Sequence, residues 1–169
     1  MSKHTMQPTI RRLSGRSEAE YCARLMAASE PWITLRRNYE ESLQHVTDPG
    51  KEVYCAVITD ELAGFMILQM QGAFTGYIQT ICIAPEWRRK GLGRQMIAFA
   101  ERRIFKDKPN VFMCVSSFNP DALRLYNRLG YETIGELKDY IVAGHAEILL
   151  RKTIAPLNSF KPDAAQTPT

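Results

Sequence analysis

Apolar and polar residues follow two different spacings along the chain, one typical of β-strands and one typical of α-helices. Alternating or continuously apolar runs, which indicate strands, lie at 9–13, 53–58, 65–70, 76–83, 111–115, 131–142 and 146–153. Apolar residues spaced by three and four positions, which indicate helices, lie at about 17–29, 35–45, 93–104 and 119–129. The predicted order is therefore β-α-α-β-β-β-α-β-α-β-β, an α/β (α+β) arrangement without internal repeats.

Local signals place the ends of two of these helices. Ser17 and Glu20 have the spacing of a capping box, so the first helix is expected to begin at Ser17. The run Asn119–Asp121 favours a helix start, because Asn caps, Pro suits the first helical position and Asp complements the helix dipole. Further along that helix, Tyr126 shares a face with aliphatic residues and is predicted to point inward.

A strand, a basic glycine-containing turn and a helix follow one another within residues 81–96. Gly91 and Gly93 are both expected to permit positive φ and the close approach of a ligand to the backbone. The first N–H groups of the following helix lack a partner in the chain and, with the positive end of the helix dipole, attract anions. The cations around this turn are Arg88, Arg89, Lys90 and Arg94. The segment therefore predicts a site for phosphate, in particular for a pyrophosphate.

Two common phosphate-binding motifs do not occur at this turn. The P-loop pattern G-x-x-x-x-G-K-[ST] is absent, and the dinucleotide pattern G-x-G-x-x-G fails because Met96 stands at its third glycine. The pattern that remains is R-x-x-G-x-G, formed by Arg88, Gly91 and Gly93. In this context it resembles the [QR]-x-x-G-x-[GA] signature of the GNAT family of N-acetyltransferases.

A second motif supports this resemblance. Residues 119–131 read N-P-D-A-L-R-L-Y-N-R-L-G-Y and match the family pattern N-x-x-A-x-x-[LF]-Y-x-[KR]-x-G-[FY], one strand after the phosphate turn. The resemblance spans residues 8–153. It implies a single-domain acetyltransferase fold, with a mixed, mostly antiparallel central sheet of about seven strands flanked by about four helices. Residues 1–7 and 154–169 are expected to be flexible termini.

The resemblance also assigns roles by motif position. The backbone expected to pair with the pantetheine arm of acetyl-CoA is that of Ile81, Cys82 and Ile83. The pyrophosphate is expected on the backbone N–H groups of Arg89, Lys90, Gly91, Leu92, Gly93 and Arg94, with Arg88 shaping the turn. The remaining cofactor contacts are expected from Asn119, Tyr126 and Arg128, of which Arg128 reaches the phosphate end.

The implied reaction moves the acetyl group of acetyl-CoA directly onto an amine of a small molecule or peptide, without a covalent acyl-enzyme. A neutral amine attacks the thioester, and a backbone N–H near Cys82 or Ile83 is expected to stabilise the oxyanion. Tyr126 is the expected catalytic acid, which protonates the leaving thiolate. Cys82 and Cys114 are not expected to act as nucleophiles, because both lie within strands without a paired histidine.

The general base and the acceptor stay open at this level. Histone-type relatives carry a glutamate on the fourth strand, but residues 76–83 contain no carboxylate, and Cys114 stands where other relatives carry a glutamate. The remaining candidates are a water relayed by Gln79, Thr80, Ser116 or Ser117, or a carboxylate of Glu30, Glu40, Glu41 or Asp139. The acceptor site is expected from residues 30–34 and 139–142, whose acidic and aromatic side chains suit a cationic amine with an apolar portion.

Composition narrows the setting of this chemistry. The chain has 169 residues, of which 45% are hydrophobic, and this suits one domain with a sizeable core. No apolar run approaches the ~20 residues that span a bilayer, and no secretory leader is evident, so a cytoplasmic protein is expected. The cysteines and histidines are scattered, which favours buried free thiols and argues against a metal site.

Much of the formal net charge of +4 lies within residues 88–103. A phosphorylated cofactor accounts for these cations without nucleic acid. The expected partners are acetyl-CoA and an amine-bearing acceptor, with no nucleic acid and no membrane, and analogy with the family allows a homodimer. Three alternatives stay open: a non-catalytic CoA-binding or regulatory module, an acyltransferase that uses another acyl group or a hydroxyl acceptor, and a basic nucleic-acid-binding protein.

Overall fold

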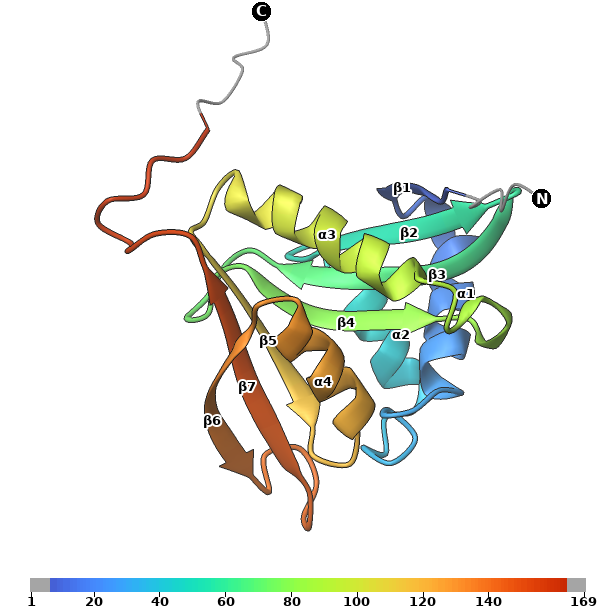
Figure 1. The fold of residues 1–169 in the computed structure, drawn as a ribbon. Helices are drawn as coiled ribbons and strands as arrows, with labels where there is room; N and C mark the ends of the chain where they lie inside the picture. The colour runs from blue at the N-terminus through green and yellow to red at the C-terminus, as the bar shows by residue number, and fades with distance from the viewer. Residues whose placement is uncertain (1–6, 164–169) are drawn as a thin grey trace, which may run out of the picture. The chain divides into compact units, whose positions relative to one another are not determined.

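The computed structural model describes residues 7–163. Its strands are β1 (Thr9–Arg12), β2 (Glu52–Ile58), β3 (Glu61–Gln69), β4 (Tyr77–Ile83), β5 (Asn110–Ser116), β6 (Glu132–Lys138) and β7 (Ala146–Thr153). Its helices are α1 (Gly15–Ala27), α2 (Tyr39–Thr47), α3 (Leu92–Phe105) and α4 (Pro120–Arg128), with a short 3-10 helix, η1, at Pro85–Trp87. The elements follow the predicted order, and the predicted fold class is confirmed (Figure 1).

The strands form one sheet in the order β1-β2-β3-β4-β5-β7-β6. Pairing is antiparallel between β1 and β2, β2 and β3, β5 and β7, and β6 and β7. β4 and β5 pair in parallel, with Tyr77 opposite Phe112 and Ile78 opposite Met113. The sheet is therefore mixed and mostly antiparallel, as predicted.

The chain divides into two compact units, each described by itself below. The first comprises the residues up to Gln69 together with Gln79–Phe99, and the second comprises Met70–Ile78 together with the residues from Ala100 onward. The first unit therefore holds the turn between β4 and α3, and the second holds α4.

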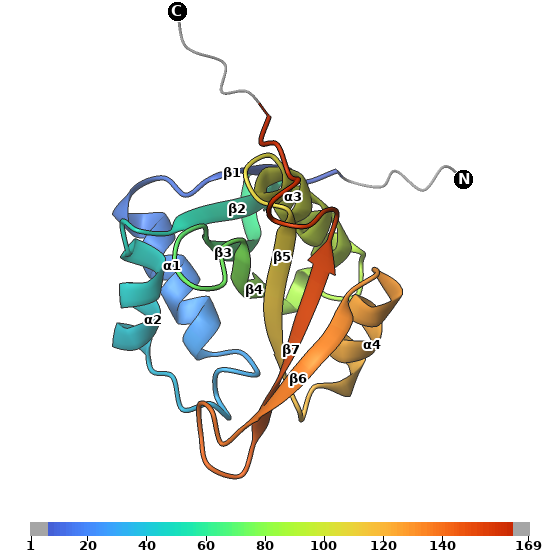
Figure 2. The ribbon, with the colours of Figure 1, turned by 90° about the vertical axis from the view of Figure 1, so that its left-hand side faces the viewer.

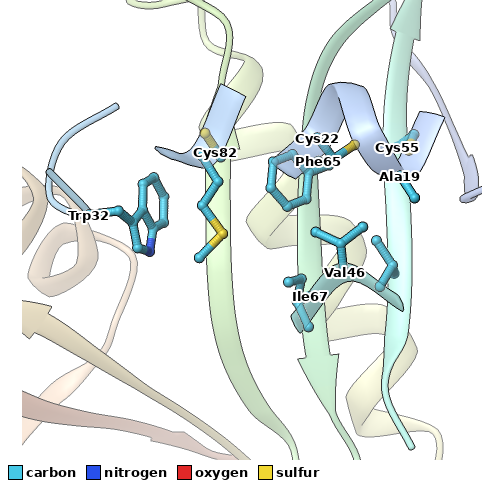
Figure 3. Close-up of a cluster of buried hydrophobic side chains, with 10 residues drawn as sticks. Ala19, Cys22, Trp32, Val46, Cys55, Phe65, Ile67 and Cys82 are labelled. Carbon is cyan, nitrogen blue, oxygen red and sulfur yellow. The ribbon is translucent and has the colours of Figure 1, made fainter. Parts of the chain in front are cut away.

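In the first unit, α1 and α2 cover one face of β2 and β3 (Figure 1). Alternate strand residues point to the same face, so the residues two apart in β2 and β3 reach these helices together. The cluster they form consists of Ala19, Cys22, Met26, Trp32, Val46, Val53, Cys55, Phe65, Ile67 and Cys82 (Figure 3). The opposite face meets α3, where the rings of Tyr54 and Phe99 lie 4.9 Å apart, edge to face. β4 and its following turn are thereby anchored to a buried core.

In the second unit, β7 lies between β5 and β6 (Figure 2). α4 follows β5 and lies against one face of β5 and β7 (Figure 1). Gly130 has φ +91 and ends α4, as its sequence position predicts. The antiparallel register places Ser116 of β5 opposite Glu147 of β7.

The predicted start of the first helix is wrong. α1 begins at Gly15 with Ser14 as its N-cap, and the Ser17–Glu20 capping box does not form. Instead, the Glu18 carboxylate accepts a hydrogen bond from the Ser14 N–H at 2.7 Å, and it pairs with Arg11 of β1 at 2.6 Å. A contact with another element therefore selects the cap.

Three other boundaries differ from the prediction. β3 begins at Glu61, four residues before the predicted start at Phe65, because Glu61–Gly64 already pair with β2. α2 begins at Tyr39 rather than near Leu35, because Asn38 and Glu41 form a capping box there. β6 ends at Lys138, since the Asp139 carboxylate accepts a hydrogen bond from the Gly144 N–H at 2.7 Å and closes a loop before β7.

Of the predicted flexible termini, residues 1–6 and 164–169 lie outside the described residues. Within 154–163, the Ile154 N–H donates to the Pro109 carbonyl and the Asp163 N–H donates to the Lys106 carbonyl. No helix in residues 7–163 combines the length and the apolar character needed to cross a membrane.

Candidate functional site

The turn between β4 and α3 is held by the side chain of Arg88. Its Nε donates to the Ile83 carbonyl at 2.9 Å, and one of its terminal nitrogens donates to Ser29 Oγ at 3.1 Å. Ser29 is only 4% exposed. Arg88 therefore links the turn to the end of β4 and to the segment that follows α1.

Replacing Arg88 with alanine should lower the free energy of unfolding by about 1 kcal/mol, because the Ile83 carbonyl and the Ser29 hydroxyl lose a charged donor. Arg94→Ala is the matched control, since it removes an exposed cation from the first turn of α3, next to the same loop. We expect it to leave the free energy of unfolding unchanged. Urea denaturation of both variants measures the difference, and equal values for the two variants would contradict this role of Arg88.

The backbone of the turn is left-handed at two places. Arg89 has φ +61 and Gly91 has φ +84. A non-glycine residue in this region costs about 1–2 kcal/mol, so the surrounding contacts must hold Arg89 there. Gly93 does not use the positive φ that a glycine permits: it is helical, and a β-carbon on it would lie 3.2 Å from Ile83 Cδ1. The missing side chain of Gly91 leaves open space beside the turn, whereas that of Gly93 allows α3 to pack closely against β4.

Backbone donors gather at the N-terminus of α3. The Gly91 carbonyl accepts from the Gln95 N–H at 3.3 Å, so the N–H groups of Leu92, Gly93 and Arg94 precede the donors of the helix's own ladder. Left-handed residues within a turn bring successive N–H groups into an anion-binding concavity. The Leu92 side chain is buried and anchors this end of the helix. The Lys90 ammonium lies 5.0 Å from the centre of the Trp87 ring, which holds a cation beside the turn.

Cys82 of β4 faces the core rather than the solvent. Its side chain belongs to the apolar cluster and hydrogen-bonds with Ser29. Burial raises the pKa of the Cys82 thiol to about 12, so it stays protonated at neutral pH. A protonated thiol is a poor nucleophile, and only the backbone of Cys82 is suited to contact a ligand.

In the second unit, Asn119 caps α4. Its Oδ1 accepts from the Ala122 N–H at 3.3 Å, and its own N–H donates to the Ser116 carbonyl at 2.8 Å. The cap uses the side-chain oxygen as acceptor, so a ligand contact from this residue falls to the amide nitrogen. Arg128 is exposed in the last turn of α4.

Tyr126 is half-buried on α4, and its ring lies 6.0 Å from that of Tyr131, edge to face. Burial raises the pKa of the Tyr126 hydroxyl, so the phenol keeps its proton at neutral pH and can donate it. Tyr131 is itself fixed, because its hydroxyl donates to Glu101 at 3.0 Å. Lys152 donates to both oxygens of the same carboxylate, each at 3.0 Å. The hydrogen bonds of Glu101 therefore fix the ring of Tyr131, against which the ring of Tyr126 packs. No local sequence signal predicted this network.

The predicted acceptor segments are only partly available to a ligand. Trp32 is 7% exposed and belongs to the core cluster, so its predicted role beside a cationic amine is wrong (Figure 3). The Glu30 carboxylate accepts from the N–H and the hydroxyl of Thr34, which stabilises its own turn. Tyr140, in the β6–β7 loop, is 63% exposed. Within residues 7–163, no group of three or more His, Cys, Asp or Glu side chains is placed to bind a metal ion.

Two curated relatives are N-alpha-acetyltransferases: the protein from Saccharolobus solfataricus is 20% identical over 137 residues, 72% of this chain and 82% of its own. The protein from Sulfurisphaera tokodaii is 22% identical over 134 residues, 70% of this chain and 80% of its own.

Solved structures share the fold. The spermidine N-acetyltransferase of Vibrio cholerae, in complex with CoA and spermine, superposes with a TM-score of 0.68 at 21% identity, covering 87% of this chain and 95% of its own. An aminoglycoside 6'-N-acetyltransferase complexed with coenzyme A gives a TM-score of 0.70 at 17% identity, and the match covers 88% of this chain and 98% of its own.

The family model described as "Acetyltransferase (GNAT) family" matches residues 19–131, which include both the turn before α3 and the whole 119–131 motif. The predicted family and the predicted enzyme class, an N-acyltransferase that uses acetyl-CoA, are thereby confirmed. This chain belongs to the acetyltransferase (GNAT) family.

Proposed function

We propose that the protein transfers the acetyl group of acetyl-CoA directly to the α-amino group at the N-terminus of a peptide or protein. The observation that carries the cofactor half of this proposal is the turn before α3. There, left-handed Arg89 and Gly91 precede the first N–H groups of a helix, which have no acceptor within the helix itself. Such a backbone suits the diphosphate of coenzyme A.

The cofactor is assigned to residues of both motifs. The donors proposed for the diphosphate are the backbone N–H groups of Arg89, Lys90, Gly91, Leu92, Gly93 and Arg94. The pantetheine arm is assigned to the backbone of Ile81, Cys82 and Ile83, although the Ile83 carbonyl already accepts from Arg88. Asn119, through its amide nitrogen, and Arg128, at the phosphate end, complete the proposed set.

Tyr126 supplies the catalytic acid in this proposal. The thiolate of coenzyme A is expelled when the amine nitrogen forms its bond to the acetyl carbon, and the Tyr126 phenol donates its proton to that sulfur. A positioned acid of this kind typically contributes ~10²–10⁴-fold to the rate. The raised pKa of Tyr126 supports the role, because the hydroxyl is fully protonated before the reaction.

The acceptor class rests on the two relatives named N-alpha-acetyltransferases. An α-amino group also suits the chemistry, because it titrates near ~8, so a useful fraction is neutral at physiological pH. A lysine-like amine titrates near ~10.4 and is almost entirely charged there. Polyamines and aminoglycosides, the substrates named for the two structural neighbours, are the competing acceptors.

Thiol release from acetyl-CoA tests this proposal on four acceptors. They are a lysine-containing peptide with a free N-terminus, the same peptide with its N-terminus blocked, spermidine, and an aminoglycoside. We expect release with the free N-terminus, and at most about a tenth of that kcat/KM with the others. Preference for spermidine or the aminoglycoside would contradict the acceptor class. Binding of CoA without thiol release on any amine or alcohol would instead indicate a non-catalytic module.

A further inference from the structure

The face of β5 and β7 that is turned away from α4 carries a cluster of polar side chains in the second unit. Cys114 and Ser116 lie two apart in β5 and share this face. Glu147 of β7 pairs directly with Ser116, and Tyr77 of β4 pairs with Phe112, which has the same parity as Cys114. The four residues Tyr77, Cys114, Ser116 and Glu147 are called the polar cluster below.

The polar cluster is bonded internally. Ser116 Oγ donates to Glu147 Oε1 at 2.7 Å, and both residues are only 4% exposed. The Tyr77 hydroxyl hydrogen-bonds with the Cys114 thiol. A buried carboxyl is costly unless it is hydrogen-bonded, and such groups concentrate at functional sites. Glu147 has no assigned role in the cofactor site.

Only one member of the polar cluster is able to accept a proton near neutral pH. Burial raises the pKa of the Tyr77 phenol and of the Cys114 thiol, so both keep their protons. Burial also raises the pKa of the Glu147 carboxyl, against the opposing effects of the Ser116 hydrogen bond and of His145. This brings Glu147 closer to the pH at which a general base works best.

The groups that face Glu147 from neighbouring elements are few. β5 contributes Ser116 and Cys114, and β4 contributes Tyr77. The β6–β7 loop contributes His145, whose positive charge would favour the carboxylate. On β6, the residue paired with Glu147 is the apolar Leu137.

We propose that Glu147 is the general base that takes a proton from the acceptor's ammonium group, an inference that rests on the proposed N-acetyltransfer. The freed amine forms the C–N bond with the acetyl carbon, and the C–S bond breaks with its electron pair on sulfur. Tyr126 gives its proton to that sulfur. The second nitrogen proton passes to the Tyr126 phenolate, and Glu147 releases its proton to water, so both residues return to their starting state.

The test measures kcat at saturating acetyl-CoA and acceptor as a function of pH, for wild type and three variants. Glu147→Gln keeps an oxygen to accept from Ser116 but takes up no proton. We expect its kcat to fall about 100-fold or more and the acid limb of its pH profile to disappear. Its affinity for CoA, measured by calorimetry, should equal that of the wild type. Glu136→Gln, at an exposed position of β6, is the matched control and should behave as the wild type.

Ser116→Ala gives an independent readout. The hydrogen bond from Ser116 lowers the pKa of Glu147, so its removal should shift the acid limb of kcat to higher pH. A limb that stays in place would overturn the proposal, as would a Glu147→Gln enzyme with a kcat near that of the wild type. A slow Glu147→Gln enzyme that retains the wild-type acid limb also overturns it, because the residue would then be structural.

Folding is monitored by thermal unfolding. A carboxyl whose pKa is raised in the folded state lowers the stability of the folded protein as the pH rises from its unfolded-state pKa through its folded-state pKa. Glu147→Gln should therefore be at least as stable as the wild type at neutral pH. A wild type that binds CoA but acetylates no amine overturns the proposed function together with this inference, whereas an active wild type with an unaffected Glu147→Gln variant overturns the inference alone.

Discussion

Replacement of Tyr126 with phenylalanine is expected to lower kcat by about tenfold or more while leaving the affinity for coenzyme A unchanged. The substitution removes one oxygen and keeps the ring that packs against Tyr131 at a centroid distance of 6.0 Å. Without the phenol, the thiolate must leave unprotonated or take its proton from water. Steady-state thiol release gives kcat, and calorimetry gives the affinity for CoA.

Tyr131→Phe is the matched control for this experiment. Tyr131 is a neighbouring tyrosine whose hydroxyl donates to Glu101 rather than serving as the proposed acid. Its replacement should lower the free energy of unfolding by about 1 kcal/mol and change kcat little. If Tyr126→Phe turned over at the wild-type rate, Tyr126 would not be the catalytic acid.

Replacement of Gly91 with valine is expected to abolish detectable binding of CoA. Gly91 has φ +84, and no atom lies within 4 Å of the position that a β-carbon would occupy. A valine there meets nothing in the unliganded protein, but it is strained by about 1–2 kcal/mol and fills the space above the turn. The loss of binding should therefore exceed the loss of stability.

Gly15→Val separates these two effects. Gly15 has φ +73 and also has open space around its β-carbon position, but it is the first residue of α1 and lies away from the turn before α3. We expect a similar loss of stability and an unchanged affinity for CoA. Equal affinities for CoA in the Gly91→Val and wild-type proteins would show that the ligand does not approach this turn.

The parts of the fold that the sequence predicted depend on local signals. The start of α4 follows from Asn119 and Pro120, and its end follows from Gly130, all within one short segment. β7 was predicted with its observed bounds, because its apolar positions are bounded by a loop on one side. The start of α1 was not predictable, since Ser14 and Ser17 are both good caps and the choice depends on the pairing of Glu18 with Arg11 in β1.

The side-chain networks around the candidate site were not predictable for the same reason. Tyr131 and Glu101 are 30 positions apart in the chain, and Ser116 and Glu147 are 31 positions apart. Glu147 stands beside the apolar run 148–150 in β7, which is a signal for a buried carboxyl, but only the register of β5 and β7 identifies its partner. Trp32 shows the converse error, because its place near Glu30 suggested a ligand contact, whereas its side chain belongs to the core.

Left-handed backbone at Arg89 was also beyond prediction. Glycine is the residue for which a sequence predicts positive φ, and Gly91 has it. Arg89 has positive φ as well, although nothing in its residue type predicts this, and the strain therefore lies at Arg89. Strain of this kind is retained only where surrounding contacts hold the backbone in place. Here the neighbouring residue Arg88 does so, because its side chain donates a hydrogen bond to the Ile83 carbonyl at the end of β4.

The central claim is that backbone donors before α3 bind the diphosphate of coenzyme A. Calorimetry with the wild-type protein tests it most directly, by comparison of CoA with pantetheine, which has the thiol arm but lacks the diphosphate. The account predicts that CoA binds with a dissociation constant below about 1 mM and that pantetheine binds about 100-fold more weakly. Equal affinities for the two ligands, or no binding of CoA, would contradict it.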